Sequence, residues 1–573
     1  MKRITSFTHF KPYGYHGIGV NDVNFSRNCV MHLTSVVPIF IINTNYFSKM
    51  KIKLLSKILL GIVVFVLLII LLIVVVAEPL IRNKIRTELN AYSSDYFINV
   101  DKVHVSLFKS GLELETLTIS SKLKQDGHPN LKGEIAFLKI KGINLLKVIF
   151  KKEIYISEVN ISNINIEGKL SFHEKSKTPK LSPLNIHIDS LFLDKINLKI
   201  KNTSSAQAYT VQDGIIKLYD IEAVKKDTLS LGLIKQFDFY AMKFVSVSPD
   251  SMYTNVAIGI NYSSVSKKLA IDSVFIQPDY KEFEFTARSK FATDRIEARI
   301  GNIHYYNFSA ADYIKHGNLI SSFIEIGDME MNVFRDTRKE TEHKKTQSLQ
   351  ELIYNFPGTI HIDSIGLNQG TVTYTEQVAR ANEPGVISFN EIKAKIYKIA
   401  NDVVYKTEEA FIMLRAEALL MGKGKVNVLL KARLFDKQNT FSLDGSLSGM
   451  DAAELNPMLE KNAFIYVTKG RIDSMNFNLV ANNTKATGKM TLLYHGLNVA
   501  VKNKRTDNTT GIKERFESLI VNKMLLDSNP LPDKPVRVGT IDYKRDPERF
   551  LFNYSAKSIL TGIKSSLIKS TKK

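Results

Sequence analysis

The chain has 573 residues, of which 44% are hydrophobic, 24% charged and 10% aromatic. These proportions are ordinary for folded domains, so they exclude a disordered chain and a polytopic membrane protein. The length fits two or three domains or one long repetitive domain, and the formal net charge of +21 suits contact with anionic lipid headgroups or nucleic acid.

The first 49 residues, 1–49, do not have the pattern of a domain. They contain no clear periodicity, and their short apolar run cannot cross a membrane. The only cysteine, Cys29, lies here, so no disulfide or thiolate metal site exists beyond it. Met50 then begins a stretch with the form of an anchor: a methionine, several lysines and an apolar run. We expect 1–49 to be a non-native or disordered extension, with Met50 rather than Met1 as the true start.

Residues 58–77 contain no charge. About twenty helical residues at 1.5 Å rise cross a ~30 Å hydrocarbon core, so we predict an anchor over 50–92 with one transmembrane helix over 58–77. Lys51, Lys53 and Lys57 precede the helix, and this bias keeps the N-terminus in the cytoplasm. A cleaved signal peptide is the alternative, but its apolar region is usually only about 7 to 15 residues long.

Beyond the anchor, apolar residues recur with period two, which is typical of strands with one buried face. From Ile154 to Ile166 they form alternating pairs whose phase shifts by one at each step, and such a shift requires a bulge, corner or tight turn. The same rhythm returns from Ile186 and from Ile360. The sequence therefore predicts an internal repeat of β-strands.

A shared tripeptide, Ile-Asp-Ser, accompanies this repeat. It begins at Ile188, Ile271, Ile362 and Ile472, and each copy precedes an apolar, a variable and an apolar residue. Short Asp and Ser side chains bond to neighbouring backbone groups, so they suit strand corners. A ligand-binding Asp-Ser pair is the other interpretation, but four copies at strand corners favour a structural role.

The copies are too unevenly spaced for a propeller or a strict solenoid. Charge-rich gaps divide the rest of the chain, and we predict a β-groove module over 93–334, a charged loop or linker over 335–350, and a second β region over 351–573. Few and short helices are expected among these strands.

The C-terminus has the pattern of an amphipathic helix. One side of this predicted helix carries four apolar residues, and lysines lie around them: Ile559, Leu560, Ile563 and Leu567, with Lys557 and Lys564. That composition suits a membrane interface or a partner surface. A helix that closes the end of the β-core is an equally good interpretation.

No constellation of catalytic residues is present. The twelve histidines are scattered without metal-ligand spacing, and the glycines at Gly422 and Gly424 lack the other residues of a phosphate loop. We therefore expect no enzyme, no cofactor and no metal. The periodicity offers instead a long apolar face, which is buried in a closed sandwich or forms a trough in an open, curled sheet.

Two regions resemble the AsmA-like superfamily of bacterial envelope proteins. The first is the lysine-flanked anchor followed by residues 103–119 and 143–166, which look like the family's opening β-module. The second is the tail, with Leu455-Asn-Pro457 and the stretch from Phe550 to Lys564. This tail resembles the C-terminal region of AsmA-like proteins from Bacteroidota-type genomes.

The resemblance implies an inner-membrane protein with a periplasmic, taco-shaped β-groove that shields acyl chains while lipid moves toward the outer membrane. The expected fold is mainly β: a transmembrane helix, then an elongated, curled antiparallel sheet with a few short helices and a C-terminal amphipathic helix. The expected partners are phospholipid or another acyl lipid, the membrane and other envelope proteins. Nucleic acid is not expected on that side of the membrane.

Repeat positions supply the predicted lining of the groove, although the periodicity leaves open which face turns inward: Ile161, Ile166, Leu193, Leu198, Leu367 and Phe477. A non-enzymatic lipid-shielding protein that serves phospholipid transport or envelope homeostasis is the leading hypothesis. The alternative is a structural scaffold with a closed β-core that aids the assembly or translocation of outer-membrane proteins.

Overall fold

The computed structural model describes residues 63–65, 80, 83–85, 87, 96–106, 110–122, 130–144, 153–170, 185–203, 205–223, 234–401, 410–502, 521 and 524–568. The predicted extension 1–49 lies outside these residues. So does the predicted span 58–77, apart from three helical residues at 63–65. Over the residues that are described, no helix combines the length and the apolar character needed to cross a membrane. The chain has two compact units, Met1–Ala77 and Glu78–Lys573, and all strands belong to the second.

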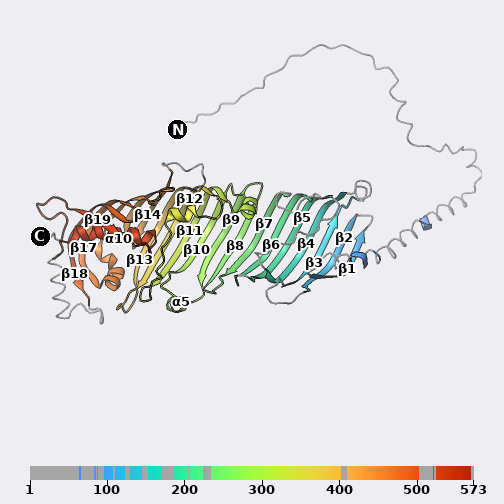
Figure 1. Ribbon diagram of the computed structural model, residues 1–573, viewed down its shortest axis with the longest axis horizontal. Helices are drawn as coiled ribbons and strands as arrows, with labels where there is room; N and C mark the ends of the chain where they lie inside the picture. The colour runs from blue at the N-terminus through green and yellow to red at the C-terminus, as the bar shows by residue number, and fades with distance from the viewer. Residues whose placement is uncertain are drawn as a thin grey trace, which may run out of the picture. The chain divides into compact units, whose positions relative to one another are not determined.

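The strands form one long open sheet of 19 strands in which each strand pairs with the strands before and after it in the chain (Figure 1). In order they are β1 Tyr96–Ser106, β2 Gly111–Ser121, β3 Asn130–Lys141, β4 Glu153–Leu170, β5 Asn185–Asn202, β6 Ala208–Ala223, β7 Ile234–Val247, β8 Tyr253–Ser263, β9 Lys268–Pro278, β10 Arg295–Tyr306, β11 Leu319–Asp336, β12 Ile360–Gln377, β13 Gly385–Ala400, β14 Phe411–Leu420, β15 Gly424–Arg433, β16 Phe441–Asp451, β17 Ile465–Ala481, β18 Lys485–Val501 and β19 Val538–Lys544.

The mainly β fold and the long sheet are confirmed. Neighbouring strands are antiparallel except at two places, β4–β5 and β11–β12, where they are parallel. A parallel pair needs a connection that returns the chain to the starting edge. Residues 337–359 make that return between β11 and β12, so the sheet continues across the predicted linker 335–350.

The two parallel steps mark an internal repeat, which confirms the prediction. β4, β5 and β6 have 18, 18 and 16 residues, and β11, β12 and β13 have the same lengths. The sequence Ile-His-Ile-Asp-Ser begins at Ile186 in β5 and at Ile360 in β12. The pairing of β5 with β6 shifts register around Ile196, and that of β12 with β13 shifts around Gly370, the corresponding place.

A residue with left-handed backbone absorbs the predicted phase shift in β4, and a bulge lies in the pairing of β5 with β6. In β4 and β5, the unpaired residues Asn163 and Lys195 have φ angles of 56° and 51°, so the apolar residues on either side keep to one face. The aspartates of the four tripeptides also fall where the pairing register is interrupted: Asp189, Asp272, Asp363 and Asp473. This placement supports the structural interpretation of the motif.

The sheet has one apolar face. Directly opposed residues of neighbouring strands share a face, and one cross-strand row, the central row, takes a residue from every strand. All its members are aliphatic or aromatic except Gly488: Val103, Leu114, Leu138, Ile161, Leu193, Ile216, Phe239, Tyr262, Leu269, Tyr305, Ile324, Ile365, Ile396, Leu414, Leu430, Leu443, Leu479, Gly488 and Ile541.

The opposite face, called the polar face below, carries charged side chains together with aromatic residues such as Phe192 and Phe323. On the first strands, lysines pair with glutamates of the neighbouring strand, as in Lys102–Glu115 at 3.0 Å and Lys139–Glu113 at 3.1 Å. These residues alternate along each strand with members of the central row. The period-two pattern in the sequence therefore reflects one apolar and one charged surface of the sheet.

The helices are short and follow the later strands. They are α5 Glu282–Arg288, α6 Ala310–His316, α7 Leu349–Tyr354, η4 Ala452–Leu455, α8 Asn456–Met458, η5 Leu459–Ala463 and α10 Leu551–Leu567. Among the helices that the structure describes, only α10 exceeds two turns. The expectation of few short helices and a C-terminal helix is thus confirmed within the described chain.

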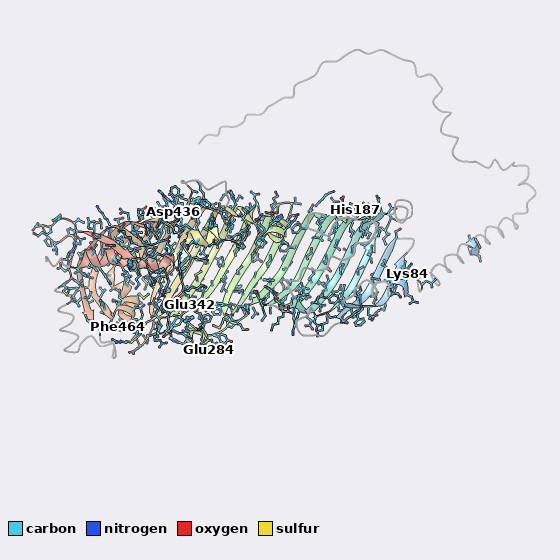
Figure 2. The ribbon with its side chains drawn as sticks, viewed as in Figure 1. Lys84, His187, Glu284, Glu342, Asp436 and Phe464 are labelled. Atoms are coloured by element: carbon cyan, nitrogen blue, oxygen red, sulfur yellow. The ribbon has the colours of Figure 1, made fainter. Side chains whose placement is uncertain are left out.

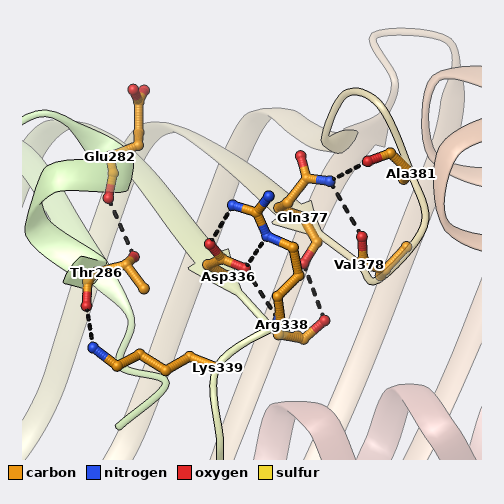
Figure 3. A network of polar contacts seen from close by, with 9 residues as sticks. Glu282, Thr286, Asp336, Arg338, Lys339, Gln377, Val378 and Ala381 are labelled. Atoms are coloured by element: carbon orange, nitrogen blue, oxygen red, sulfur yellow. Dashed lines mark hydrogen bonds and ion pairs between the residues drawn. The ribbon is translucent and has the colours of Figure 1, made fainter. Parts of the chain in front are cut away.

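A polar network fixes α5 to the end of β11 (Figure 3). Arg338 donates to the carboxylate of Asp336 at 2.7 Å, and this hydrogen bond holds the pKa of Asp336 below its ordinary value. Lys339 donates to the carbonyl oxygen of Thr286 at 2.7 Å and also to that of Ser289. The ammonium thereby adds a side-chain donor to carbonyl groups at the C-terminal end of helix α5.

Candidate functional site

The apolar face at β4 and β5 lies outside the buried apolar clusters of the described chain, although Val159, Ile164 and Ile196 are themselves buried. Four of the six predicted lining residues lie there, as two directly opposed pairs, Ile161–Leu193 and Ile166–Leu198. All four side chains are half-buried. None of the five buried apolar clusters formed by the described residues includes a residue of β4 or β5. Apolar surface is therefore displayed along these strands.

The two pairs belong to different rows of the same face. Ile161 and Leu193 are members of the central row, which is roughly 85 Å long because neighbouring strands lie about 4.8 Å apart. Ile166 and Leu198 belong to a second row that runs from β1 to β13: Ile98, Ile119, Gly133, Ile166, Leu198, Val211, Phe244, Ala257, Val274, Ile300, Met329, Gly370 and Ile392.

Helices cover the same face from β7 onward. Ala310 of α6 packs in a cluster with Phe237 and Tyr262, and Ile353 of α7 packs in another with Ile324. The hydroxyl of Tyr262 donates to the carbonyl oxygen of Phe308 at 3.3 Å, so even this buried phenol has a partner. The C-terminal half of the apolar face is therefore largely a packed core.

The remaining two predicted lining residues lie in this later half. Leu367 is half-buried in β12, opposite Ala394. Phe477 is 8% exposed and belongs to the largest cluster, with its ring against Gly445 of β16. Leu367 and Phe477 are on the same face as the other four, because successive opposed pairs join them into one row, but Phe477 is core.

Helix α10 covers the end of the apolar face. Ile559, Ile563 and Leu567 pack against the cluster that contains Phe477, whereas Leu560 is 42% exposed. Lys557 and Lys564 are exposed on the same helix. The packing accords with the interpretation of a helix that closes the β-core, and it leaves Leu560 and the two lysines as the surface for any contact with a membrane.

Close contacts seat this helix. A Cβ added at Gly562 would lie 2.8 Å from Cγ1 of Ile541, so only a glycine allows the observed approach. The hydroxyls of Ser565 and Thr561 accept hydrogen bonds from the backbone N–H groups of Thr540 and Asp542 in β19, at 3.0 and 3.2 Å. These N–H groups face away from β18, so α10 caps the free edge of the sheet.

One cluster of metal-ligand type was not foreseen from the sequence. His187, Asp189 and Asp220 come from β5 and β6, and their ligand atoms lie within 4.8 Å of one another. His187 lies at the rim of the sheet (Figure 2) and is 3.0 Å from Asp189. The hydroxyl of Tyr155 donates to Asp189 at 2.6 Å, which raises the pKa of this phenol. Within the cluster, His187 and Asp189 are thus hydrogen-bonded to each other, and His361–Asp363 repeats this pair at 3.1 Å.

Comparison with known proteins adds no relative: no protein-family model matches the chain, and no curated protein matches it. The features that bear on its function are therefore the apolar face and the resemblance of sequence pattern.

Proposed function

We propose that this protein is an AsmA-like envelope protein that shields lipid acyl chains along the apolar face of its sheet. The observation that carries the proposal is the central row, which offers an aliphatic or aromatic side chain in each of 19 strands except at Gly488. No other described feature extends over the whole length of the sheet.

The energetics favour acyl chains as the ligand. Burial of each methylene group contributes about 0.8 kcal/mol, and a row of roughly 85 Å is longer than the ~30 Å core of a bilayer. Packed clusters bury the later part of this row, so acyl chains would bind along its uncovered strands, around β4 and β5. The polar face keeps such a loaded sheet soluble, because its lysines and glutamates remain in water.

In this proposal the chain acts without chemical change of its ligand. The segment 58–77 anchors it in the inner membrane with the N-terminus in the cytoplasm, and the sheet curls in the periplasm into a groove that serves phospholipid transport to the outer membrane or envelope homeostasis. The bulk of the binding free energy comes from the displayed residues of β4 and β5.

A second candidate is a scaffold with a dry core that aids the assembly of outer-membrane proteins. The packed clusters beneath α7 and α10 favour it, because they bury much of the apolar face in the later strands. The two candidates differ in what touches Leu193: lipid in the first, protein in the second.

Site-specific photocrosslinking in intact cells tests the proposal. A benzophenone side chain at Leu193 or Ile161 should form adducts with lipid, identified by mass spectrometry. Phe192 is the matched control, because it is the neighbouring residue, is also apolar, and lies on the opposite face, where its ring contacts Tyr219. Equal lipid labelling at Phe192 and Leu193, or protein adducts alone at Leu193, would argue against the groove.

A further inference from the structure

A hollow of about 1090 Å³ lies across β12 to β18. Each of these strands contributes three consecutive residues: 366–368, 393–395, 415–417, 427–429, 444–446, 476–478 and 489–491. The middle residues form the row that joins Leu367 to Met490 on the apolar face. The flanking residues therefore point to the other face.

Phe323 settles on which face the hollow opens. It lines the hollow, and it directly precedes Ile324 of the central row, so its side chain is on the polar face. The ammonium of Lys395 lies 5.8 Å from the centre of its ring. The hollow is therefore separate from the proposed acyl-binding surface, on the opposite side of the sheet.

Amides and hydroxyls line one side of the hollow. Asn427, Ser446, Asn476 and Thr491 are directly opposed on four successive strands, so they form a ladder with steps of about 4.8 Å. Each side chain offers a donor and an acceptor. A ligand with several neighbouring hydroxyl groups matches such a ladder.

Three cations of the hollow form no ion pair with any described residue, although two acids, Glu417 and Asp444, also line it. These cations are Lys393, Arg415 and Lys489. The carboxylate of Glu417 pairs with Lys425 at 3.2 Å. Glu417 is directly opposite Lys393 but is engaged by Lys425, whereas on the first strands of the same face the lysines pair with the glutamates opposite them.

Two of the cations are directly opposed. Lys395 of β13 and Arg415 of β14 occupy one antiparallel pair, and like charges in that position destabilise a sheet. Phe323 and Tyr397 hold the ammonium of Lys395, at 5.8 and 5.2 Å from their ring centres. An anion bound between Lys395 and Arg415 would offset the repulsion between these two cations. Phosphate suits this position, because a guanidinium binds it in bidentate geometry.

We propose that this hollow is a binding site for a phosphorylated, hydroxyl-rich ligand, with the phosphate on Lys395 and Arg415 and the hydroxyls on the ladder from Asn427 to Thr491. A lipid headgroup and a free sugar phosphate share this chemistry. The site does not depend on acyl binding, since it lies on the other face of the sheet.

Calorimetry on the full chain in detergent micelles tests the site with two probes, glucose 6-phosphate and a short-chain phosphatidylinositol phosphate. We expect both probes to bind, and glucose to bind at least tenfold more weakly than glucose 6-phosphate. Tighter binding of the phosphatidylinositol phosphate identifies a lipid headgroup as the ligand, and equal binding identifies the sugar phosphate itself. Absence of binding by both probes overturns the proposal.

A pair of double variants provides the control for charge. Lys395→Gln with Arg415→Gln should weaken binding at least tenfold. Lys102→Gln with Lys139→Gln removes the same charge from the polar face outside the hollow and should leave the affinity unchanged. Equal losses in both would show general electrostatic attraction and overturn the site. The first variant relieves the opposed charges, so its unfolding temperature should not fall, and lost binding then does not reflect misfolding.

Discussion

Replacement of Gly539 by alanine should loosen α10 from the sheet. An added Cβ would meet the carbonyl oxygen of Gly562 at 2.6 Å and also the hydroxyl of Ser566. The carbonyl belongs to the helix backbone, so no rotamer change relieves the contact and the whole helix has to shift. Overpacking of this kind destabilises by about 1 to 3 kcal/mol. Helix opening should therefore rise by about 5- to 150-fold.

Hydrogen exchange of the α10 amides, followed by mass spectrometry on the full chain, measures this opening. Gly562→Ala should have a smaller effect, because its Cβ would meet only side-chain atoms of Ile541 and Met490. Leu560→Ala is the control, since that side chain is 42% exposed. If Gly539→Ala and Leu560→Ala exchange at the same rate, the helix is not seated on β19 as described.

Three further variants probe other parts of the sheet. The Arg338 hydrogen bond lowers the pKa of Asp336, so its stabilisation is complete above the ordinary carboxyl pKa near ~4 and is lost as pH falls through the lower folded value. Arg338→Ala should thus reduce the free energy of unfolding by about 1 kcal/mol at neutral pH, after allowance for solvent screening of this half-exposed guanidinium, and by nothing in strong acid. Urea unfolding at several pH values measures the difference. Phe477→Ala removes a buried ring and should destabilise by about 3 to 5 kcal/mol, seen in thermal unfolding; a loss below about 1 kcal/mol would indicate an open rather than packed site. Thr561→Ala with Ser565→Ala uncaps the N–H groups of β19 and should increase self-association in analytical ultracentrifugation, whereas an unchanged mass would mean that α10 covers the edge without those hydroxyls.

The strand pattern was readable from the sequence because one face of each strand is apolar along its whole length. The alternation from Ile154 to Ile166 predicted the strand, and its phase breaks at Asn163, whose left-handed backbone keeps the apolar residues on one face. The sequence did not reveal the parallel pairs β4–β5 and β11–β12. Periodicity is identical in parallel and antiparallel strands, and only the pairing distinguishes them.

The candidate sites were harder to foresee. Periodicity placed Ile161, Leu193 and Phe477 on one face, but burial depends on helices that pack from elsewhere in the chain, and α10 buries only the last of them. The ladder of the hollow was invisible for a related reason. Asn427 and Thr491 are distant in sequence, and the intervening strands bring them into one row.

Each strand pairs only with its chain neighbours, so the length of this sheet increases in proportion to the number of its strands. Stability in such an array is a sum of nearest-neighbour terms, so a hairpin can be gained or lost in evolution without disturbing distant strands. Each added strand extends the apolar face by about 4.8 Å. The length of the apolar face is thus set by how many times the strand unit is copied.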